Sequence, residues 1–205
     1  MQLFHYHLVT SRVRQVEARY VGKLGFSLVA RHGRIGEDYQ SFGAGVSWEE
    51  LDKLGFKLRL CELERGGVNV VIQPGQWDLP RVDHLGLALD EDEFEDVLAR
   101  AMQRELRVQA HGGRRTFVAT NAGYRLEIHP PRDWLEELLE AWTEFALGEL
   151  QLLAEDPVEK AEALAALLDL EPGDGGTIVD VGSTRIRFLP DGPPGRPQLH
   201  AELFL

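Results

Sequence analysis

The feature of this sequence that most constrains its fold is an internal repeat. Two stretches, one opening at His5 and one at His84, each read as a short strand, an amphipathic helical run and a further strand. Aligning His5 with His84 brings Leu8 over Leu87 without a gap. The helical runs carry apolar side chains at roughly 3.6-residue spacing, so each helix has one face for packing on a sheet. Self-similarity of this kind predicts a chain built from copies of one supersecondary unit.

The two copies also end in the same way. Residues 68–74 and residues 124–130 each predict a strand that a proline terminates. Between its helix and its final strand, the second copy has two more predicted strands, at 107–111 and 115–120. Each unit is therefore expected to have the order βαβββ.

The first copy departs from this pattern by a long insertion. Residues 32–55 contain glycine at five positions. We expect this segment to be a loop with one short helical turn near Trp48.

A third, degenerate copy follows residue 148. Its first strand begins at Glu149, its helix has Pro157 at the first position, and a Gly182-Ser183 turn joins two more strands. The chain ends in another predicted strand. The expected organisation is a pair of βαβββ units at residues 1–131 (1–80 and 81–131), a connecting helix at 132–147, and a third, degenerate βαβββ-like unit at 148–205.

Composition narrows the class of partner. The net charge of −12 argues against nucleic acid, because phosphate binding needs clustered Lys and Arg. No stretch approaches the roughly 20 apolar residues of a membrane span, and the first residues lack the character of a signal peptide. The single cysteine, Cys61, excludes an intramolecular disulfide, and we interpret it as a small strand residue. These features together lead us to expect a cytoplasmic protein.

The opening of each repeat resembles a glyoxalase/bleomycin-resistance/dioxygenase module of the vicinal oxygen chelate superfamily. The motifs are His5 followed by Leu24-Gly25-Phe26, and Asp83-His84-Leu85-Gly86 closed by Leu126-Glu127-Ile128-His129-Pro130. The resemblance covers residues 3–131 well and residues 148–190 in pattern only. It implies an α+β fold in which paired βαβββ modules form a cup-shaped mixed sheet around a small-molecule site. It does not select one reaction, because functions differ widely on one fold.

The resemblance also implies a metal site. Metal-binding members draw ligands from the first and last strand of each module, which here gives His5, Val71, His84 and Glu127. Val71 cannot bind a metal, so the implied set is His5, His84 and Glu127. Two imidazoles and one carboxylate are similar to the sets of the extradiol dioxygenases and fosfomycin-resistance thiol transferases, and form a facial triad. The implied cofactor is a divalent metal, with Fe, Mn, Zn and Ni all open.

Strand parity gives an argument from the residues themselves. Side chains alternate faces along a strand, so His5 and His7 share one face, and Arg125, Glu127 and His129 share another. Polar groups gathered on a core strand are costly to bury unless they have partners. His7 is the alternative first ligand if the register of the first strand slips by two residues. The competing interpretation is that these groups are satisfied core residues or ion pairs.

Further residues are candidates around this site. We expect His129 and His111 to act as acids or bases, and Gln73 and Arg125 to contact substrate. Tyr124 should point away from the cup by parity. In the third copy the matching positions are Glu149 and Arg187, which predict a salt bridge, or no interaction at all, rather than a metal site.

Two functions follow from these expectations. The first is a metalloenzyme, a dioxygenase or a lyase/isomerase, acting on a small oxygenated substrate chelated to the metal. The alternative is a metal-free binding protein in which Trp48, Trp77 and Phe42 stack on a flat ligand. Because an open sheet face in the third unit must be covered by the first two or by a second chain, we also expect a homodimer.

Overall fold

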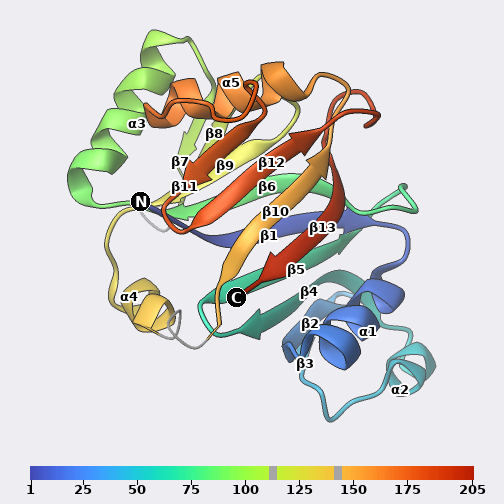
Figure 1. The fold of residues 1–205 in the computed structure, drawn as a ribbon. Coiled ribbons are helices and arrows are strands. Elements are labelled where there is room, and N and C mark those ends of the chain that lie inside the picture. The colour runs from blue at the N-terminus through green and yellow to red at the C-terminus, as the bar shows by residue number, and fades with distance from the viewer. Residues whose placement is uncertain (111–114, 141–144) are drawn as a thin grey trace.

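The computed structural model describes residues 1–110, 115–140 and 145–205. The first unit is a five-stranded arm with two helices (Figure 1). Its elements are β1 (Gln2–Thr10), α1 (Val13–Leu24), β2 (Ser27–Ile35), β3 (Asp38–Phe42), α2 (Trp48–Lys53), β4 (Lys57–Arg65) and β5 (Val68–Pro74). The alternation of apolar and polar residues predicted β1 and β4, the apolar run ended by Pro74 predicted β5, and the spacing of apolar residues predicted α1.

The second unit repeats the strand–helix–three-strand order. Its elements are β6 (Arg81–Ala88), α3 (Glu91–Gln103), β7 (Val108–Ala110), β8 (Thr116–Ala119) and β9 (Arg125–His129). Helix α3 begins at a capping box. The Asp90 side chain accepts a hydrogen bond from the Glu93 backbone N–H, and the Glu93 side chain accepts one from the Asp90 backbone N–H. A local signal in the sequence therefore fixes where this helix starts.

The two units join through their first strands. Strands β1 and β6 pair antiparallel at the centre, and each has the last strand of its own unit as a parallel neighbour, β5 beside β1 and β9 beside β6. His5 lies beside Asn69 in one unit and His84 beside Arg125 in the other. The repeat alignment read from the sequence is therefore also the alignment of the two units in space, and the paired-unit α+β fold is confirmed.

The insertion in the first unit was predicted incorrectly in part. Its first half is not a loop, because β2 runs to Ile35 and turns at Gly36, with φ +60°, into the antiparallel strand β3. The expected helical turn near Trp48 is present as α2. The alternation of side chains in residues 38–42 is a strand signal that the neighbouring glycines obscured.

The described helix of the connecting segment is shorter than the expected helix at residues 132–147. Helix α4 spans Asp133–Glu140, and residues 141–144 lie outside the described part of the chain. Phe145 is already part of the apolar core, where its ring stacks on Phe204 at 4.7 Å between centroids.

The third unit contains β10 (Leu147–Leu153), α5 (Pro157–Leu168), β11 (Ile178–Val181), β12 (Thr184–Leu189) and β13 (Gln198–Phe204). Strand β12 lies parallel to β10 on one side, and β13 lies antiparallel to β10 on the other side. Strand β13 therefore pairs with β10 in the way that β6 pairs with β1, as an antiparallel neighbour. The parallel strand of the third unit is β12. Strand β13 also reaches β6, through the pair Gln198 and Arg81.

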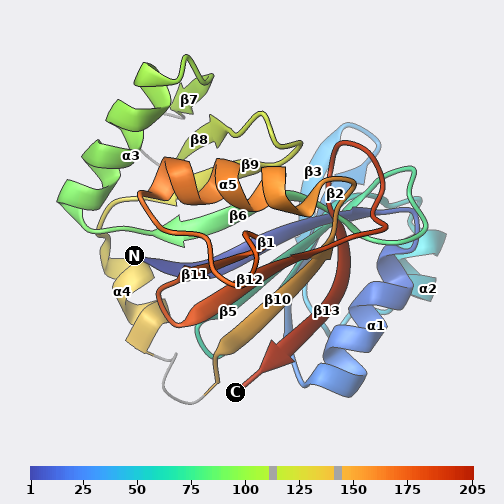
Figure 2. The same ribbon diagram turned by 45° about the horizontal axis from the view of Figure 1, so that its top comes forward.

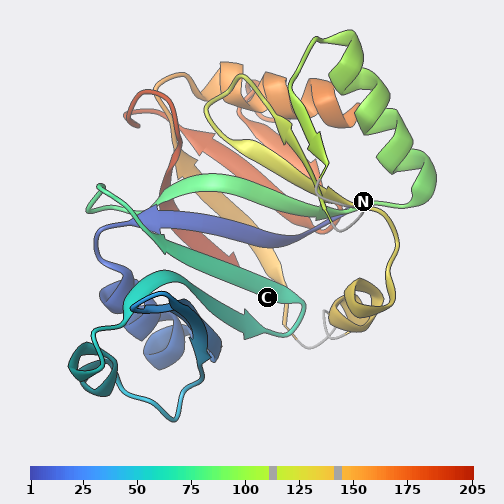
Figure 3. The same ribbon diagram turned by 180° about the vertical axis from the view of Figure 1, so that it is seen from behind.

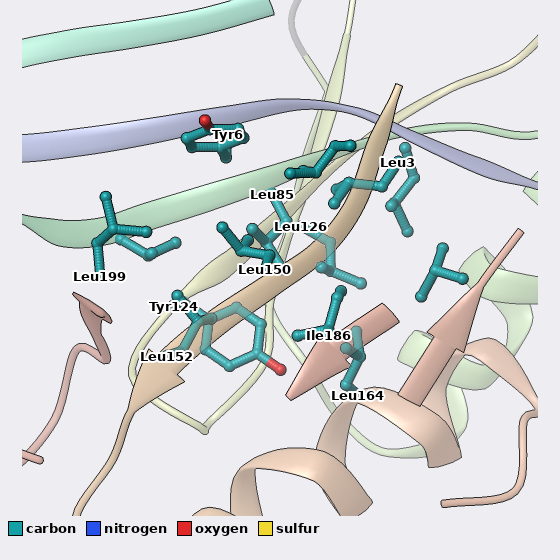
Figure 4. Close-up of a cluster of buried hydrophobic side chains, with 14 of the residues drawn as sticks. Leu3, Tyr6, Leu85, Tyr124, Leu126, Leu150, Leu152, Leu164, Ile186 and Leu199 are labelled. Atoms are coloured by element: carbon teal, nitrogen blue, oxygen red, sulfur yellow. The ribbon is translucent and has the colours of Figure 1, made fainter. Parts of the chain in front are cut away.

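The main core lies between the third unit and the paired units. Figures 1 and 2 show β10, β12 and β13 crossing one face of β1, β5 and β6, and Figure 3 shows the opposite face, beside which α4 lies. Buried side chains from both layers meet in one cluster (Figure 4). Members of this cluster labelled in the figure include Leu3, Tyr6, Leu85, Leu126, Leu150, Leu152 and Ile186.

This packing bears on the expected dimer. The apolar face of the third unit is covered by the first two units of the same chain. The open face that suggested a homodimer is therefore absent from the described structure, and the homodimer stays a prediction. The cytoplasmic location also stays a prediction. Within the described ranges, no helix has the length and apolar character needed to cross a membrane.

Candidate metal centre

Three buried histidines meet where β1 and β6 pair. His7 lies directly opposite His84 in the antiparallel register, and His5 lies opposite Gly86. His5 Nε2 and His84 Nε2 are 3.1 Å apart, and the ring centroids of His7 and His84 are 4.7 Å apart. One ligand atom from each of the three lies within 4.8 Å of the others, so His5, His7 and His84 can hold a metal ion.

Gly86 makes this approach of the two strands possible. A Cβ atom at position 86 would lie 2.6 Å from the Cβ of His5, which is closer than two carbons can pack. When one unit is superposed on the other, His5 matches His84 and His7 matches Gly86. The pair of His7 and His84 is therefore equivalent to the pair of Gly86 and His5. The site is therefore asymmetric, with a histidine in the first unit at the position where the second unit has glycine.

A β-bulge alters the simple parity of β1. The register with β6 shifts between Leu3 and His5, and Phe4 lines the same cavity as His5 and His7. A bulge inserts one residue and turns the following side chains to the other face. Sequence parity alone would have turned Phe4 away from the site.

Asn69 fixes which nitrogen of His5 carries a proton. The Asn69 amide nitrogen donates to the carboxylates of Glu62 and Glu64, at 3.0 and 2.9 Å, so the amide oxygen faces His5. His5 Nδ1 is 2.6 Å from that oxygen and must donate to it. The hydrogen-bond network thus assigns the proton to Nδ1 and leaves the Nε2 of neutral His5 with a free lone pair.

Asp83 acts on His84 in the same way. The carboxylate accepts from His84 Nδ1 at 2.9 Å and is also paired with Arg125 and, at 2.7 Å, with Arg196. Burial would raise the pKa of Asp83, but the hydrogen bonds from His84 and Arg125 lower it far below its usual value. An ionised Asp83 holds the proton of His84 on Nδ1 and directs Nε2 toward His5.

Glu127 completes the group from β9. Its Oε2 lies 2.9 Å from His84 Nε2, and its Oε1 accepts from His129 Nε2 at 3.0 Å. Burial would raise the pKa of Glu127, whereas the hydrogen bond from His129 and the contact with His84 lower it far below its usual value. Glu127 is therefore a buried carboxylate that stays ionised at neutral pH.

The group as a whole has more acceptors than protons. His84 Nε2 faces both the His5 lone pair and the Glu127 carboxylate. Burial, followed by the field of His84, lowers the pKa of His5 to about 4, so His5 is neutral at pH 7. With the His84 proton on Nδ1, the Nε2 lone pair, the His5 lone pair and the carboxylate face one another with no proton between them, whereas a cation placed among the three atoms is attracted to all of them. The donor set therefore fits a divalent metal.

A cavity of about 850 Å³ opens beside these residues. Its size is that of a small-molecule site, which typically measures about 300–1,000 Å³. Apolar side chains from several elements form part of its wall, and among them are Phe4, Val71, Phe117, Trp134 and Leu138. The polar wall includes the metal-centre residues together with Gln73, Arg125 and His129.

The sequence matches no protein-family model and no curated protein. Solved structures do match. A halotolerant catechol dioxygenase, BphC, superposes with a TM-score of 0.60 at 13% identity, over 99% of this chain and 69% of that one. A mutant 4-hydroxymandelate synthase from Streptomyces coelicolor gives 0.57 at 13% identity, over 92% and 62%. The Mn(II)-bound glyoxalase from Novosphingobium aromaticivorans gives 0.53 at 13% identity, over 98% and 64%.

The chain has the vicinal oxygen chelate fold. It spans less than two-thirds of the length of the synthase and the glyoxalase. The three neighbours carry the names of three different activities, so the shared fold does not select a reaction for this chain.

Within this vicinal oxygen chelate fold, most of the expected residues share the one cavity. His5, His84 and Glu127 are in contact as described, and Val71 occupies the fourth position as an apolar wall residue. Gln73 lies exposed at the rim, and Arg125 stands over the Phe117 ring at 4.7 Å while paired with Asp83. His111 lies outside the described residues. The roles of these residues stay predictions.

Other expectations concern residues away from the cavity. Tyr124 points away as predicted, with its hydroxyl donating to the Lys160 carbonyl oxygen in the third unit. Arg187 and Glu149 form the predicted ion pair, at 3.0 Å. The aromatic residues expected to stack a ligand in a metal-free protein line no part of the main cavity: Trp48 lies between Arg14 and Arg31, Trp77 beside Arg81, and Phe42 against Phe56.

Three residues that hold the site histidines in place, directly or through Asp83, were not predicted: Asn69, Asp83 and Arg196. Asn69 had a usable signal, because it is an amide in the otherwise apolar run from Val68 to Ile72. Asp83 precedes His84 directly and was also visible in the sequence. Arg196 comes from the loop between β12 and β13, and nothing local connects that loop with His84.

Proposed function

We propose that this chain is a metal-dependent enzyme that acts on a small oxygenated substrate, with a divalent metal held by His5, His84 and Glu127. The observation that carries the proposal is the close approach of their three metal-binding atoms, at 3.1 and 2.9 Å, in a network whose protons lie on the outer nitrogens. Histidine ligands in metalloproteins commonly donate the N–H of the ring nitrogen that is not bound to the metal to a carboxylate or an amide oxygen in this manner.

A divalent ion at this position would supply Lewis-acid polarisation of two neighbouring oxygens of a bound substrate. The protein's own contribution is positional. The apolar side chains of Val71, Phe117 and Trp134 line the cavity and would limit the access of water to the bound substrate. Arg125 and Gln73 offer N–H donors for substrate oxygens.

His129 is the proton-handling residue in this proposal. Its Nε2 donates to Glu127 Oε1, which leaves Nδ1 without a proton in the neutral ring. That Nδ1 is buried and has no hydrogen-bond partner among the described residues. His129 thus holds Glu127 in place through one nitrogen and offers the other as a base. His111 is a second candidate acid or base from the sequence.

The test is elemental analysis of protein purified without chelators. Near-stoichiometric Fe, Mn, Zn or Ni is expected in the wild type, and loss of that metal in His84→Ala and in Glu127→Ala. The matched control is His200→Ala, which removes an exposed histidine of β13. Only trace metal in the wild type would overturn the proposal, and a variant that kept its full metal content would remove that residue from the ligand set.

A further inference from the structure

We infer that His7 is a fourth protein ligand of this metal and supplies the donor that Val71 cannot. The inference rests on the proposed metal function and specifies its coordination. It replaces the expectation from sequence, in which His7 was an alternative to His5 after a register slip. No slip is present, because His5 pairs with Asn69 in the first unit as His84 pairs with Arg125 in the second.

Strand pairing places His7 beside the vacant position. In the parallel register of β1 and β5, His7 lies directly beside Val71. In the antiparallel register of β1 and β6, His7 lies directly opposite His84. One side chain on β1 therefore neighbours both the position that lacks a ligand and a residue that has one.

The imidazole of His7 also has an unused nitrogen. His7 is 8% exposed, and its Nε2 is buried with no hydrogen-bond partner in the described part of the chain. Buried side-chain nitrogens without a partner are rare, and an ion is one of the recognised explanations. Its ring stands edge-on to that of His84, with an interplanar angle of 62°.

The spacing of the three imidazoles fits a common ion after a small adjustment. Their ligand atoms lie within 4.8 Å of one another. With metal–nitrogen bonds of about 2.1 Å, ligand atoms on opposite sides of an ion are about 4.2 Å apart and adjacent ones are closer. At most one of the three pairs can lie on opposite sides of the ion, so binding requires the His7 ring to move toward His5 and His84.

A fourth ligand changes what the centre can accommodate. A six-coordinate ion held by two histidines and a carboxylate has three open positions, as in the iron oxygenases with that triad. With His7 bound, two positions remain, enough for two neighbouring oxygens of one substrate and for no second co-substrate. The inference therefore favours an isomerase or lyase reaction over one that adds dioxygen at the metal.

The experiment measures binding of Co(II) and, by pulsed EPR, the number of imidazoles bound to Cu(II). The wild type is expected to show three imidazoles. His7→Ala and the near-isosteric His7→Gln should show two, with the Co(II) dissociation constant raised by more than the roughly 10–100-fold that loss of an outer partner produces. Moving the ligand one strand over, in His7→Val with Val71→His, should restore affinity and the third imidazole. His200→Ala is the matched control.

The outcomes separate this inference from the proposed function. Unchanged affinity and an unchanged imidazole count in folded His7→Gln would overturn the role of His7, while loss of metal in His84→Ala in the same series would leave the proposed function standing. If the wild type binds neither ion, both fall together. Circular dichroism of each variant confirms that the fold is intact.

Discussion

An imidazole binds a metal only through a nitrogen that carries no proton, and its neighbours decide which nitrogen that is. In this protein Asn69 decides for His5 and Asp83 decides for His84. Both hold the proton on Nδ1 and leave Nε2 free to bind a metal. Single outer residues therefore control the donor atoms, and their substitution should affect metal binding without removing a ligand.

Asn69→Ala tests this control at the level of one residue. Without the amide oxygen, His5 loses the acceptor that fixes its tautomer and its ring orientation. The dissociation constant for Co(II) should rise roughly 10–100-fold. Gln73→Ala is the control, because Gln73 lies on the same strand and lines the same cavity without contacting a histidine in the described structure. Equal affinities of the two variants would contradict the role given to Asn69.

The sequence identified which residues line this site more reliably than it identified which of them are in contact. The repeat placed His5 and His84 at equivalent positions, and strand parity placed Arg125, Glu127 and His129 on one face, where all three line the cavity. His7 was harder to interpret, because its neighbour His84 is 77 residues away and is set by the pairing of two distant strands. Local patterns reveal the face of a strand but not its partner.

At the scale of elements, the site depends on how closely β1 and β6 can lie. Gly86→Ala would place a Cβ atom 2.6 Å from the Cβ of His5, so one of the two strands must move. Overpacking of this kind costs about 1–3 kcal/mol in the free energy of unfolding. Because His5 and His84 lie on the strands that would separate, metal affinity should fall as well. Urea unfolding and Co(II) titration measure the two effects.

Gly22→Ala provides the matched control for that substitution. Gly22 is exposed within α1, and a Cβ atom there would meet nothing within 4 Å. Alanine restricts the unfolded chain and suits a helix, so this variant should gain about 0.5–1 kcal/mol in stability and bind metal as the wild type does. A Gly86→Ala protein as stable as Gly22→Ala would contradict the close approach of the strands.

Elements were predicted reliably where the repeat supported them and less well elsewhere. Strands β5 and β9 matched because each copy confirms the other. The end of β2 and the whole of β3 were interpreted as a loop, since the insertion has no counterpart in the second copy to reveal its strand pattern. The place of β13 could not be read from its sequence, because an alternating strand fits equally well on either side of β10.

At the scale of the whole molecule, the third unit supports the site from behind. Glu202 of β13 accepts from Tyr20 and Arg19 in α1, and the Tyr20 hydroxyl lies 3.1 Å from that of Tyr6, between His5 and His7 in sequence. The loop before β13 provides Arg196, which pairs with Asp83. The third unit, which has no histidines at the matching positions, thus contacts the strands that carry the candidate metal centre in the first two units.

Arg196→Ala tests this support over the longest range. Arg196 stabilises the ionised Asp83, which in turn holds the proton of His84 on Nδ1. Because Arg125 still pairs with Asp83 in the variant, the loss should be partial, and we expect a several-fold rise in the Co(II) dissociation constant, less than the roughly 10–100-fold expected for loss of a direct partner.

Arg185→Ala isolates the effect from loss of a surface charge. Arg185 lies in the same third unit and pairs with Asp180, it does not line the main cavity, and exposed pairs of this kind contribute little to stability. Its Co(II) affinity should equal that of the wild type. If Arg196→Ala and Arg185→Ala bind Co(II) equally well, the third unit does not act on the metal centre through Asp83, and its contribution is confined to the packing against β1, β6 and β9.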